Sequence, residues 1–190
     1  GSLPLARTSI VPLATAQLVA ARPGVRVTVF EGQYERLLER LRSGEIDFIV
    51  GALRVPPPVK DITQEPLFDD PLEIVVGSGH PLLKKQGVTL KDTLVFPWVA
   101  SPETTPAGQY LAQILDLAKG AENPIRVTAS SSAFLRGILQ SGPFVSVISR
   151  QQAKYEIESG LVVPLPIALS DSLRSIGLTF RADWRPTPTQ

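Results

Sequence analysis

Residues 26–54 read RVTVFEGQYERLLERLRSGEIDFIVGALR and predict two strands with a helix between them. β-Branched and aromatic residues dominate positions 25–30, and this run stops at a Glu-Gly turn, as at the end of a strand. Apolar side chains then recur three and four positions apart from Tyr34 to Leu41, with charged residues between them, which predicts an amphipathic helix. Gly44 is expected to end this helix, and the short apolar segment 47–50 predicts a buried strand.

A strand, a helix and a second strand in this order form a right-handed crossover between two parallel strands. The turn at residues 31–33 then follows the carboxyl end of a strand. Ligands bind at that end of the strands in open α/β sheets. The sequence therefore predicts an α/β fold and makes this turn the first candidate for a binding site.

The composition is that of a globular protein with many rigid loops. Of 190 residues, 43% are hydrophobic, 19% are charged and 18 are proline, and a chain of this length buries roughly 70% of its unfolded surface. A net charge of +1 without a cationic stripe argues against nucleic-acid binding by this segment itself. The absence of Cys excludes disulfides and thiolate chemistry. No apolar run approaches the roughly 18 residues of a membrane span, so no membrane contact is expected. Because Met is also absent, Gly1 is expected to begin a fragment or a processed product.

Strands and helices alternate along the rest of the chain. Strands are expected at residues 3–6, 72–77, 95–100, 125–129, 144–149, 161–165 and 173–181, and helices at residues 10–21, from Pro106 to Gly120, between Ser132 and Gly142 and before Ser159.

The proline-rich residues 55–61 interrupt this alternation and predict a division into two lobes. We expect two Rossmann-like lobes with a central cleft and two hinge crossings near residues 55–70 and 166–172, the geometry of a small-molecule clamp. Lobe I would comprise residues 1–70 and 168–190, with Trp184 packed against it, and lobe II residues 71–167.

The helix expected at Ile10–Ala21 is apolar on nearly every side. Ser9 is a suitable N-cap, and Pro12 falls in the first turn, where its missing N–H costs nothing. A helix without a polar face is buried on two sides. We expect one side to lie on the sheet and the other to contact a second copy of the chain.

Polar turns before four helices provide the candidate ligand contacts. Any one of them is first explained as a helix cap, because Ser and Thr are the usual N-cap residues. Together, on opposed lobes, their hydroxyls and the free helix N–H groups would suit a carboxylate or a polyhydroxylated ligand. Arg7, Arg54 and Arg150 could add a guanidinium, although pairing with an acidic side chain is the simpler expectation for each. The candidate ligand contacts are Thr8, Ser9, Gln33, Thr104, Thr105, Ser130, Ser131, Arg54 and Arg150.

Catalytic, metal and cofactor sites are not indicated. His80 is the single histidine and has no nucleophile motif to serve, so its His-Pro-Leu setting is read as structural. One His, no Cys and scattered carboxylates do not make a transition-metal site. Gly77 and Gly79 lack the third glycine of a dinucleotide-binding loop. We therefore expect a non-enzymatic protein without a cofactor.

The order and spacing of several motifs along the whole chain resemble the effector-binding domain of LysR-type transcriptional regulators. These motifs are Gly1-x-Leu3, PGVRVTVFEGQYERLLERLRSGEIDFIVGAL, His80-Pro81-Leu82, ILQSGPFVSVISR and ESGLVVPLP. The resemblance implies a type 2 periplasmic-binding-protein fold with a small effector in its cleft, lined by the turns at Thr8, Ser9 and Ser130 to Ser132. It also implies an antiparallel homodimer and a winged helix-turn-helix DNA-binding domain located before residue 1 and absent from this chain. The ending FRADWRPTPTQ resembles regulators of sugar and aromatic-acid metabolism.

The predicted function is therefore that of a cytoplasmic effector-sensing domain. It would bind a small sugar, sugar acid or aromatic acid between its lobes and alter the arrangement of a dimer to control transcription. The alternative is a periplasmic solute-binding protein of the same fold, which a leader peptide before Gly1 would indicate and a helix-turn-helix would exclude. An enzyme of this fold is disfavoured by the missing acid–base constellation.

Overall fold

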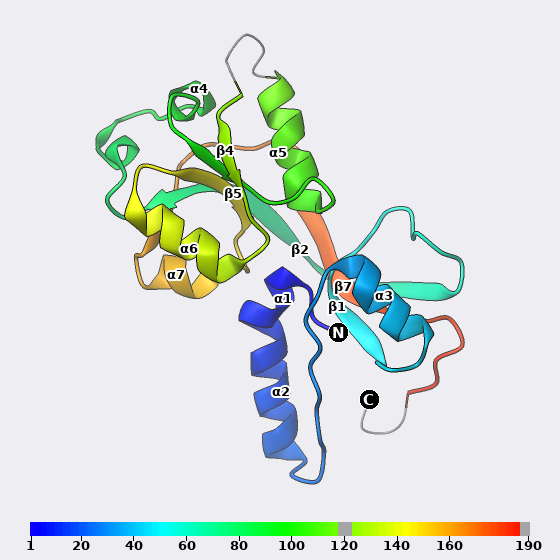
Figure 1. Cartoon of the computed structure of the whole chain (residues 1–190). Helices are drawn as coiled ribbons and strands as arrows, with labels where there is room; N and C mark the ends of the chain where they lie inside the picture. Colours follow the sequence, from blue (N-terminus) through cyan, green and yellow to red (C-terminus); the bar gives the residue numbers. More distant parts are fainter. Residues whose placement is uncertain (118–122, 187–190) are drawn as a thin grey trace. The chain divides into compact units, whose positions relative to one another are not determined.

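A computed structural model describes residues 1–117 and 123–186 (Figure 1). The chain divides into two compact units. Unit 1 comprises Gly1–Asp70 and Arg174–Gln190, and unit 2 comprises Pro71–Leu173. No helix in the described ranges is long and apolar enough to cross a bilayer.

The sheet of unit 1 contains β1 (Phe48–Ala52), β7 (Leu173–Arg181) and the first part of β2 (Ile62–Gly77), in the order β1-β7-β2. β1 and β7 are antiparallel, which confirms that the last strand returns to the first part of the chain. Trp184 follows β7 and lies 5.2 Å from Phe180 and 6.0 Å from Phe48 between ring centroids, as expected.

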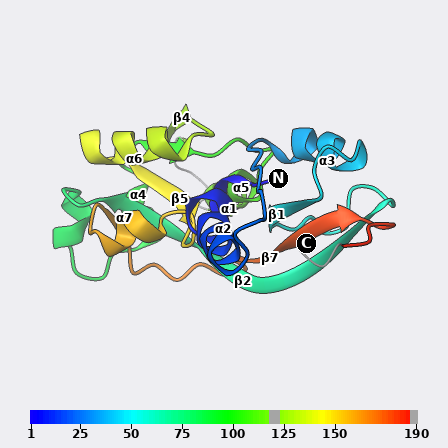
Figure 2. The same cartoon turned by 90° about the horizontal axis from the view of Figure 1, so that it is seen from below.

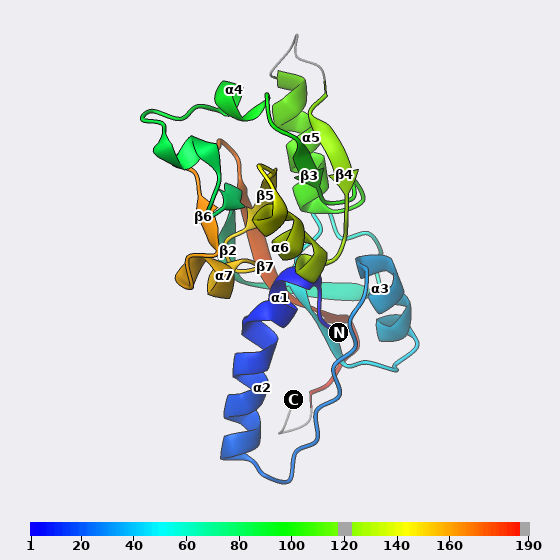
Figure 3. The same ribbon diagram turned by 60° about the vertical axis from the view of Figure 1, so that its left-hand side comes forward.

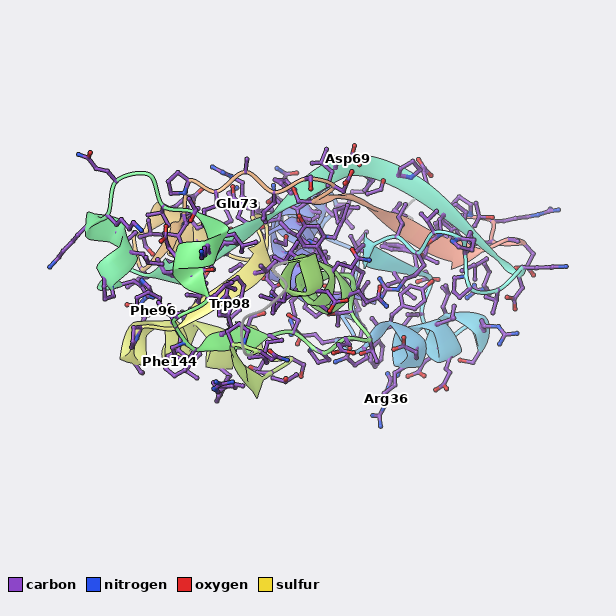
Figure 4. The ribbon with its side chains drawn as sticks, turned by 90° about the horizontal axis from the view of Figure 1, so that it is seen from above. Arg36, Asp69, Glu73, Phe96, Trp98 and Phe144 are labelled. Atoms are coloured by element: carbon purple, nitrogen blue, oxygen red, sulfur yellow. The ribbon has the colours of Figure 1, made fainter. Side chains whose placement is uncertain are left out.

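Helices cover both faces of this sheet. α3 (Tyr34–Arg42) buries Tyr34, Leu37 and Leu41 on one face, as its apolar spacing predicts, and Figure 2 shows it on one side of β1 and β7. Its charged face is exposed, and Figure 4 shows Arg36 pointing away from the ribbon. Gly44 follows α3 with φ of +79°, the left-handed conformation that favours glycine. α1 (Pro4–Thr8) packs on the opposite face.

Two strands expected in unit 1 are absent. Residues 3–6 were expected to be a strand, but α1 begins at Pro4, where the fixed φ of proline suits the first helical position. Residues 25–30 are extended but form no strand, because the N-terminal segment that could pair with them turns into α1. The two segments that were predicted to form a parallel pair are connected through Ser2, which makes parallel bridges to Glu31 and to Val50.

α2 (Ile10–Ala21) has the predicted bounds but not the predicted burial. None of its residues is buried, and it runs away from α1 beside the extended residues that follow it (Figures 1 and 3). The chain partly buries Ile10 and Val11 against the core of β1 and β7, so the expected burial of one side occurs only at the start of the helix.

Unit 2 is built on a sheet in the order β6-β2-β5-β3-β4, where β2 contributes its second part. β2 is antiparallel to β5 and β6, whereas β3 is parallel to β4 and β5. These strands are β3 (Trp98–Ala100), β4 (Ile125–Thr128), β5 (Val145–Ser149) and β6 (Val162–Pro164). The helices are η1 (Pro81–Lys84), α4 (Leu90–Thr93), α5 (Pro106–Leu117), α6 (Ser132–Ser141) and α7 (Lys154–Glu158).

Both faces of the unit 2 sheet are buried, which explains the apolar run that ends β2. Ile74 and Val76 face a core that contains Trp98 and residues of α5, whereas Val75 faces a second core with residues of α6. Every strand expected here is present, shortened by one to three residues at its ends except β2. The expected helix end at Gly120 lies outside the described residues.

β2 begins at Ile62, ten residues before the expected start at Leu72. Residues 55–70 were expected to be a hinge crossing because of the proline-rich residues 55–61, but the part of this segment from Ile62 onward is a strand. The first part of β2 is the edge strand of the unit 1 sheet, where the missing N–H of Pro66 is tolerated.

Candidate functional site

Arg7 and Arg54 of unit 1 both contact the loop at residues 31–34. Thr8 ends α1, and its hydroxyl donates to the carbonyl oxygen of Pro4 at 3.3 Å. Arg7 pairs with Glu31 at 3.0 Å, which fastens the end of α1 to this loop. The expected acidic partner of Arg7 is thus present, and Thr8 is the next residue along the chain.

Ser9 connects α1 to α2 and is 2% exposed. Its carbonyl oxygen accepts the first helical hydrogen bond, from the N–H of Leu13 at 3.1 Å. Ser9 is the N-cap residue of α2, as predicted, but its side chain makes no capping hydrogen bond with this helix. Gln33 is the N-cap residue of α3 without a side-chain cap, and its side chain is exposed.

Arg54 follows β1 and lies over the ring of Tyr34, with its guanidinium carbon 4.5 Å from the ring centroid. Tyr34 is the first residue of α3, next to Gln33, so Arg54 belongs to the same group of residues. Burial lowers the pKa of Arg54 from its usual value, whereas Tyr34 and Glu35 raise it. Burial also raises the pKa of Tyr34, against the positive charge of Arg54.

In unit 2 the predicted contacts share one edge of the sheet. β3, β4 and β5 are mutually parallel, with Ala100 opposite Thr128 and Val99 opposite Ser146. The turn at residues 101–105 follows β3, the turn at residues 129–132 follows β4, and Arg150 follows β5. All of them therefore lie at the carboxyl ends of parallel strands, where α/β sheets bind ligands.

The hydroxyls of Thr105 and Ser131 cap the helices that follow these turns, which was the simpler expectation for them. Thr105 accepts a hydrogen bond from the N–H of Gly108 at 3.1 Å and donates to the carbonyl oxygen of Pro102 at 2.7 Å. Ser131 accepts from the N–H of Phe134 at 3.3 Å. The side chains of Thr104 and Ser130 are exposed in the same turns.

Arg150 pairs with Glu73 at 2.7 Å, with its backbone N–H bonded to the carbonyl oxygen of Pro71. Figure 4 marks Glu73 on β2. The acidic partner expected for Arg150 is present, so its charge is already balanced within unit 2.

Sequence reasoning missed a buried ion pair in unit 1. Arg174 on β7 contacts Asp70 on β2 at 3.2 Å, and the two side chains are 15% and 1% exposed. Burial lowers the pKa of Arg174, whereas Asp70 raises it. The signal that could have revealed the pair is the pairing of strands from opposite ends of the chain, which local patterns do not contain.

His80 has a structural environment, in agreement with the reading of its motif. Its Nδ1 accepts a hydrogen bond from the N–H of Leu82 at 3.2 Å and so caps η1. Its ring meets Phe96, labelled in Figure 4, edge-on with 4.6 Å between centroids. Burial lowers its pKa from 6.5. Within residues 1–117 and 123–186, no cluster of three His, Cys, Asp or Glu side chains could hold a metal ion.

Known regulators resemble this chain over nearly its whole length. It is 36% identical to the HTH-type transcriptional regulator GalR of Pseudomonas putida over 99% of the chain and 47% of that protein. It is 32% identical to the HTH-type transcriptional regulator PcaQ of Agrobacterium fabrum over 98% of the chain and 60% of that protein. The chain thus spans about half the length of these relatives.

Solved structures share its fold. The regulatory domain of CcmR from Synechocystis, in complex with 2-PG, has a TM-score of 0.82 at 16% identity and covers 98% of this chain and 88% of its own. The effector-binding domain of QuiR, in complex with shikimate, has a TM-score of 0.78 at 17% identity and covers 100% and 88%. These matches confirm the predicted type 2 periplasmic-binding-protein fold. The sequence profile of the LysR substrate binding domain matches residues 1–190, and the chain therefore belongs to that family.

Proposed function

We propose that this chain is the effector sensor of a LysR-type transcriptional regulator and binds a small polar or anionic metabolite, a sugar, sugar acid or aromatic acid. The candidate contacts are Thr8, Ser9, Gln33 and Arg54 in unit 1 and Thr104, Thr105, Ser130, Ser131 and Arg150 in unit 2. The observation that carries the proposal is that the unit 2 contacts lie together at the carboxyl ends of parallel strands. The effector complexes of the CcmR and QuiR domains support it.

The effector would act as a signal without being transformed. Its binding shifts a regulator between arrangements only if it binds one of them better, because equal affinity for both changes no population. The DNA contacts would come from a helix-turn-helix domain outside this chain, in the cytoplasm. The relatives named as HTH-type regulators favour this function over solute delivery in the periplasm.

We further propose a homodimer through α2. Its apolar residues Leu13 and Val19 are 47% and 42% exposed. A groove of about 430 Å³ runs between α2, the extended residues 25–29 and β1. A second copy of the chain would bury this surface, and stable interfaces cover about 800 Å² on each partner.

Thermal unfolding with a ligand panel tests the effector proposal. The panel would contain sugars, sugar acids, aromatic acids and simple anions, and a ligand at a hundred times its Kd stabilises the folded state by about 2.7 kcal/mol. We expect Ser9→Ala and Ser131→Ala to weaken the response to a stabilising ligand. Ser141→Ala is the matched control, because Ser141 bonds to Gly137 at the other end of α6. A response that survives both test variants would contradict the proposed site.

A further inference from the structure

Two arginines, Arg54 and Arg174, lie near the point where β1 and β7 of unit 1 end their pairing. Ala52 is opposite Ile176, and the N–H of Leu53 bonds to the carbonyl oxygen of Ser175 at 2.9 Å. Arg54 is the residue after Leu53, and Arg174 is the residue before Ser175, so the two arginines flank this bond. The positive charge of Arg54 lowers the pKa of Arg174, as expected for like charges that repel.

The buried carboxylate of Asp70 pairs with one of these two arginines. Asp70 contacts the Nη2 atom of Arg174, whose Nε atom is buried and has no hydrogen-bond acceptor among the described residues. Arg54 has no ion pair in the part of the chain that the structure describes, although the exposed Glu35 influences its pKa. Arg7 and Arg150 differ, because each has its own acidic partner. Among the described residues, Asp70 is therefore the carboxylate in direct contact with this pair, and Glu35 acts on Arg54 without an ion pair.

Arg54 is held in place by the polar groups around it. Its backbone N–H donates to Oε1 of Gln64 at 2.9 Å, and Nε2 of Gln64 donates back to the carbonyl oxygen of Arg54 at 2.7 Å. Its Nη1 atom bonds to the carbonyl oxygen of Ala52 at 3.3 Å, and its guanidinium is stacked on Tyr34. A guanidinium fixed in this way loses little freedom when it binds an anion.

We propose that Arg54 and Arg174 together bind an oxyanion, and that the effector therefore carries a carboxylate. This rests on the proposed function, in which Arg54 is one of the effector contacts. The planar donors of a guanidinium match the two oxygens of a carboxylate. The anion would also relieve the repulsion between the two arginines. We therefore expect the effector to be a sugar acid or an aromatic acid and not a neutral sugar.

Sulfate is the probe, with the midpoint of thermal unfolding followed at constant ionic strength as sulfate replaces chloride. We expect sulfate to raise the midpoint of the unchanged protein, and Arg54→Gln to weaken sulfate binding about 10- to 100-fold, the loss typical of a hydrogen bond to a charged group. Arg54→Lys should bind with intermediate affinity. Arg7→Gln is the control for the loss of one cation from unit 1.

Arg174 is tested with its partner neutralised, because removal of the arginine alone would leave Asp70 buried and unpaired. The double variant Asp70→Asn with Arg174→Gln should also lose the sulfate response. Equal sulfate responses of Arg54→Gln and the unchanged protein would overturn the inference. A neutral sugar that still requires Ser131 would then leave the proposed function standing without this anion site.

Discussion

The hydroxyl of Tyr110 donates a hydrogen bond of 2.6 Å to the carbonyl oxygen of Ser170. Tyr110 lies on α5, which directly follows the candidate contacts Thr104 and Thr105, and Ser170 lies just before β7. Burial, together with the charge of Asp171, raises the pKa of Tyr110, so the phenol stays protonated and remains a donor at neutral pH. The bond fixes α5 to the segment that leads out of unit 2.

Tyr110→Phe should therefore destabilise the protein. It leaves a carbonyl oxygen without its donor, a loss of about 1 kcal/mol, which lowers the midpoint of thermal unfolding by about 2–4 °C in a chain of this size. Tyr155→Phe on α7 is the control, because Tyr155 is 45% exposed. Equal midpoints for the two variants would show that the Tyr110 bond contributes nothing.

Gly77, at the end of β2, permits close packing against α6. A Cβ atom there would lie 1.9 Å from the carbonyl oxygen of Leu139, which belongs to the helix backbone and cannot rotate away. Gly77→Ala should force α6 from the sheet and cost about 1–3 kcal/mol in urea denaturation. Gly79→Ala is the control, since nothing lies within 4 Å of its Cβ position. A stable Gly77→Ala protein would mean that α6 shifts without loss.

Elements whose pattern is local were predictable from the sequence. The period of Tyr34 to Leu41 defined α3, and Thr105 followed by Pro106 marked the start of α5. The strand expected at residues 25–30 did not form, although its local pattern favoured one. A strand needs a partner, and the N-terminal segment leaves the sheet at Pro4, so β-propensity could not produce pairing by itself.

The candidate site was predictable in the same uneven way. Residues in turns after strands, such as Ser131, could be found because the residue types that form a turn are neighbours in the sequence. Arg174 could not, because it comes near Arg54 only through the pairing of β1 with a strand from the far end of the chain. Long-range register depends on the whole fold, which no local window contains.

Leu13 on α2 should control self-association. Leu13→Asp would place a carboxylate within the apolar surface that we propose to be covered by a second copy, where desolvation without a partner is costly. We expect a dimer for the unchanged chain and a monomer for Leu13→Asp, measured by sedimentation velocity. Val95→Asp in unit 2, where the side chain is 82% exposed, should leave the mass unchanged. A Leu13→Asp dimer would place the interface elsewhere.

His80 should make stability depend on pH in the acidic range. It is 3% exposed, and burial lowers its pKa below the ordinary value of 6.5, although the carbonyl oxygen of Pro143 opposes this shift. Between the lowered pKa and 6.5 the unfolded chain binds more protons than the folded one, so stability falls as pH falls through this window. Protonation of Nδ1 would also remove the acceptor of the Leu82 N–H.

His80→Asn should reduce this dependence, because an amide oxygen can accept the same N–H bond and does not titrate. Urea denaturation of both proteins between about pH 5 and pH 8 measures the difference, and the single histidine gives one NMR titration curve. An NMR pKa at or above 6.5 would contradict the argument, because the folded state would then bind the proton as well as the unfolded chain does.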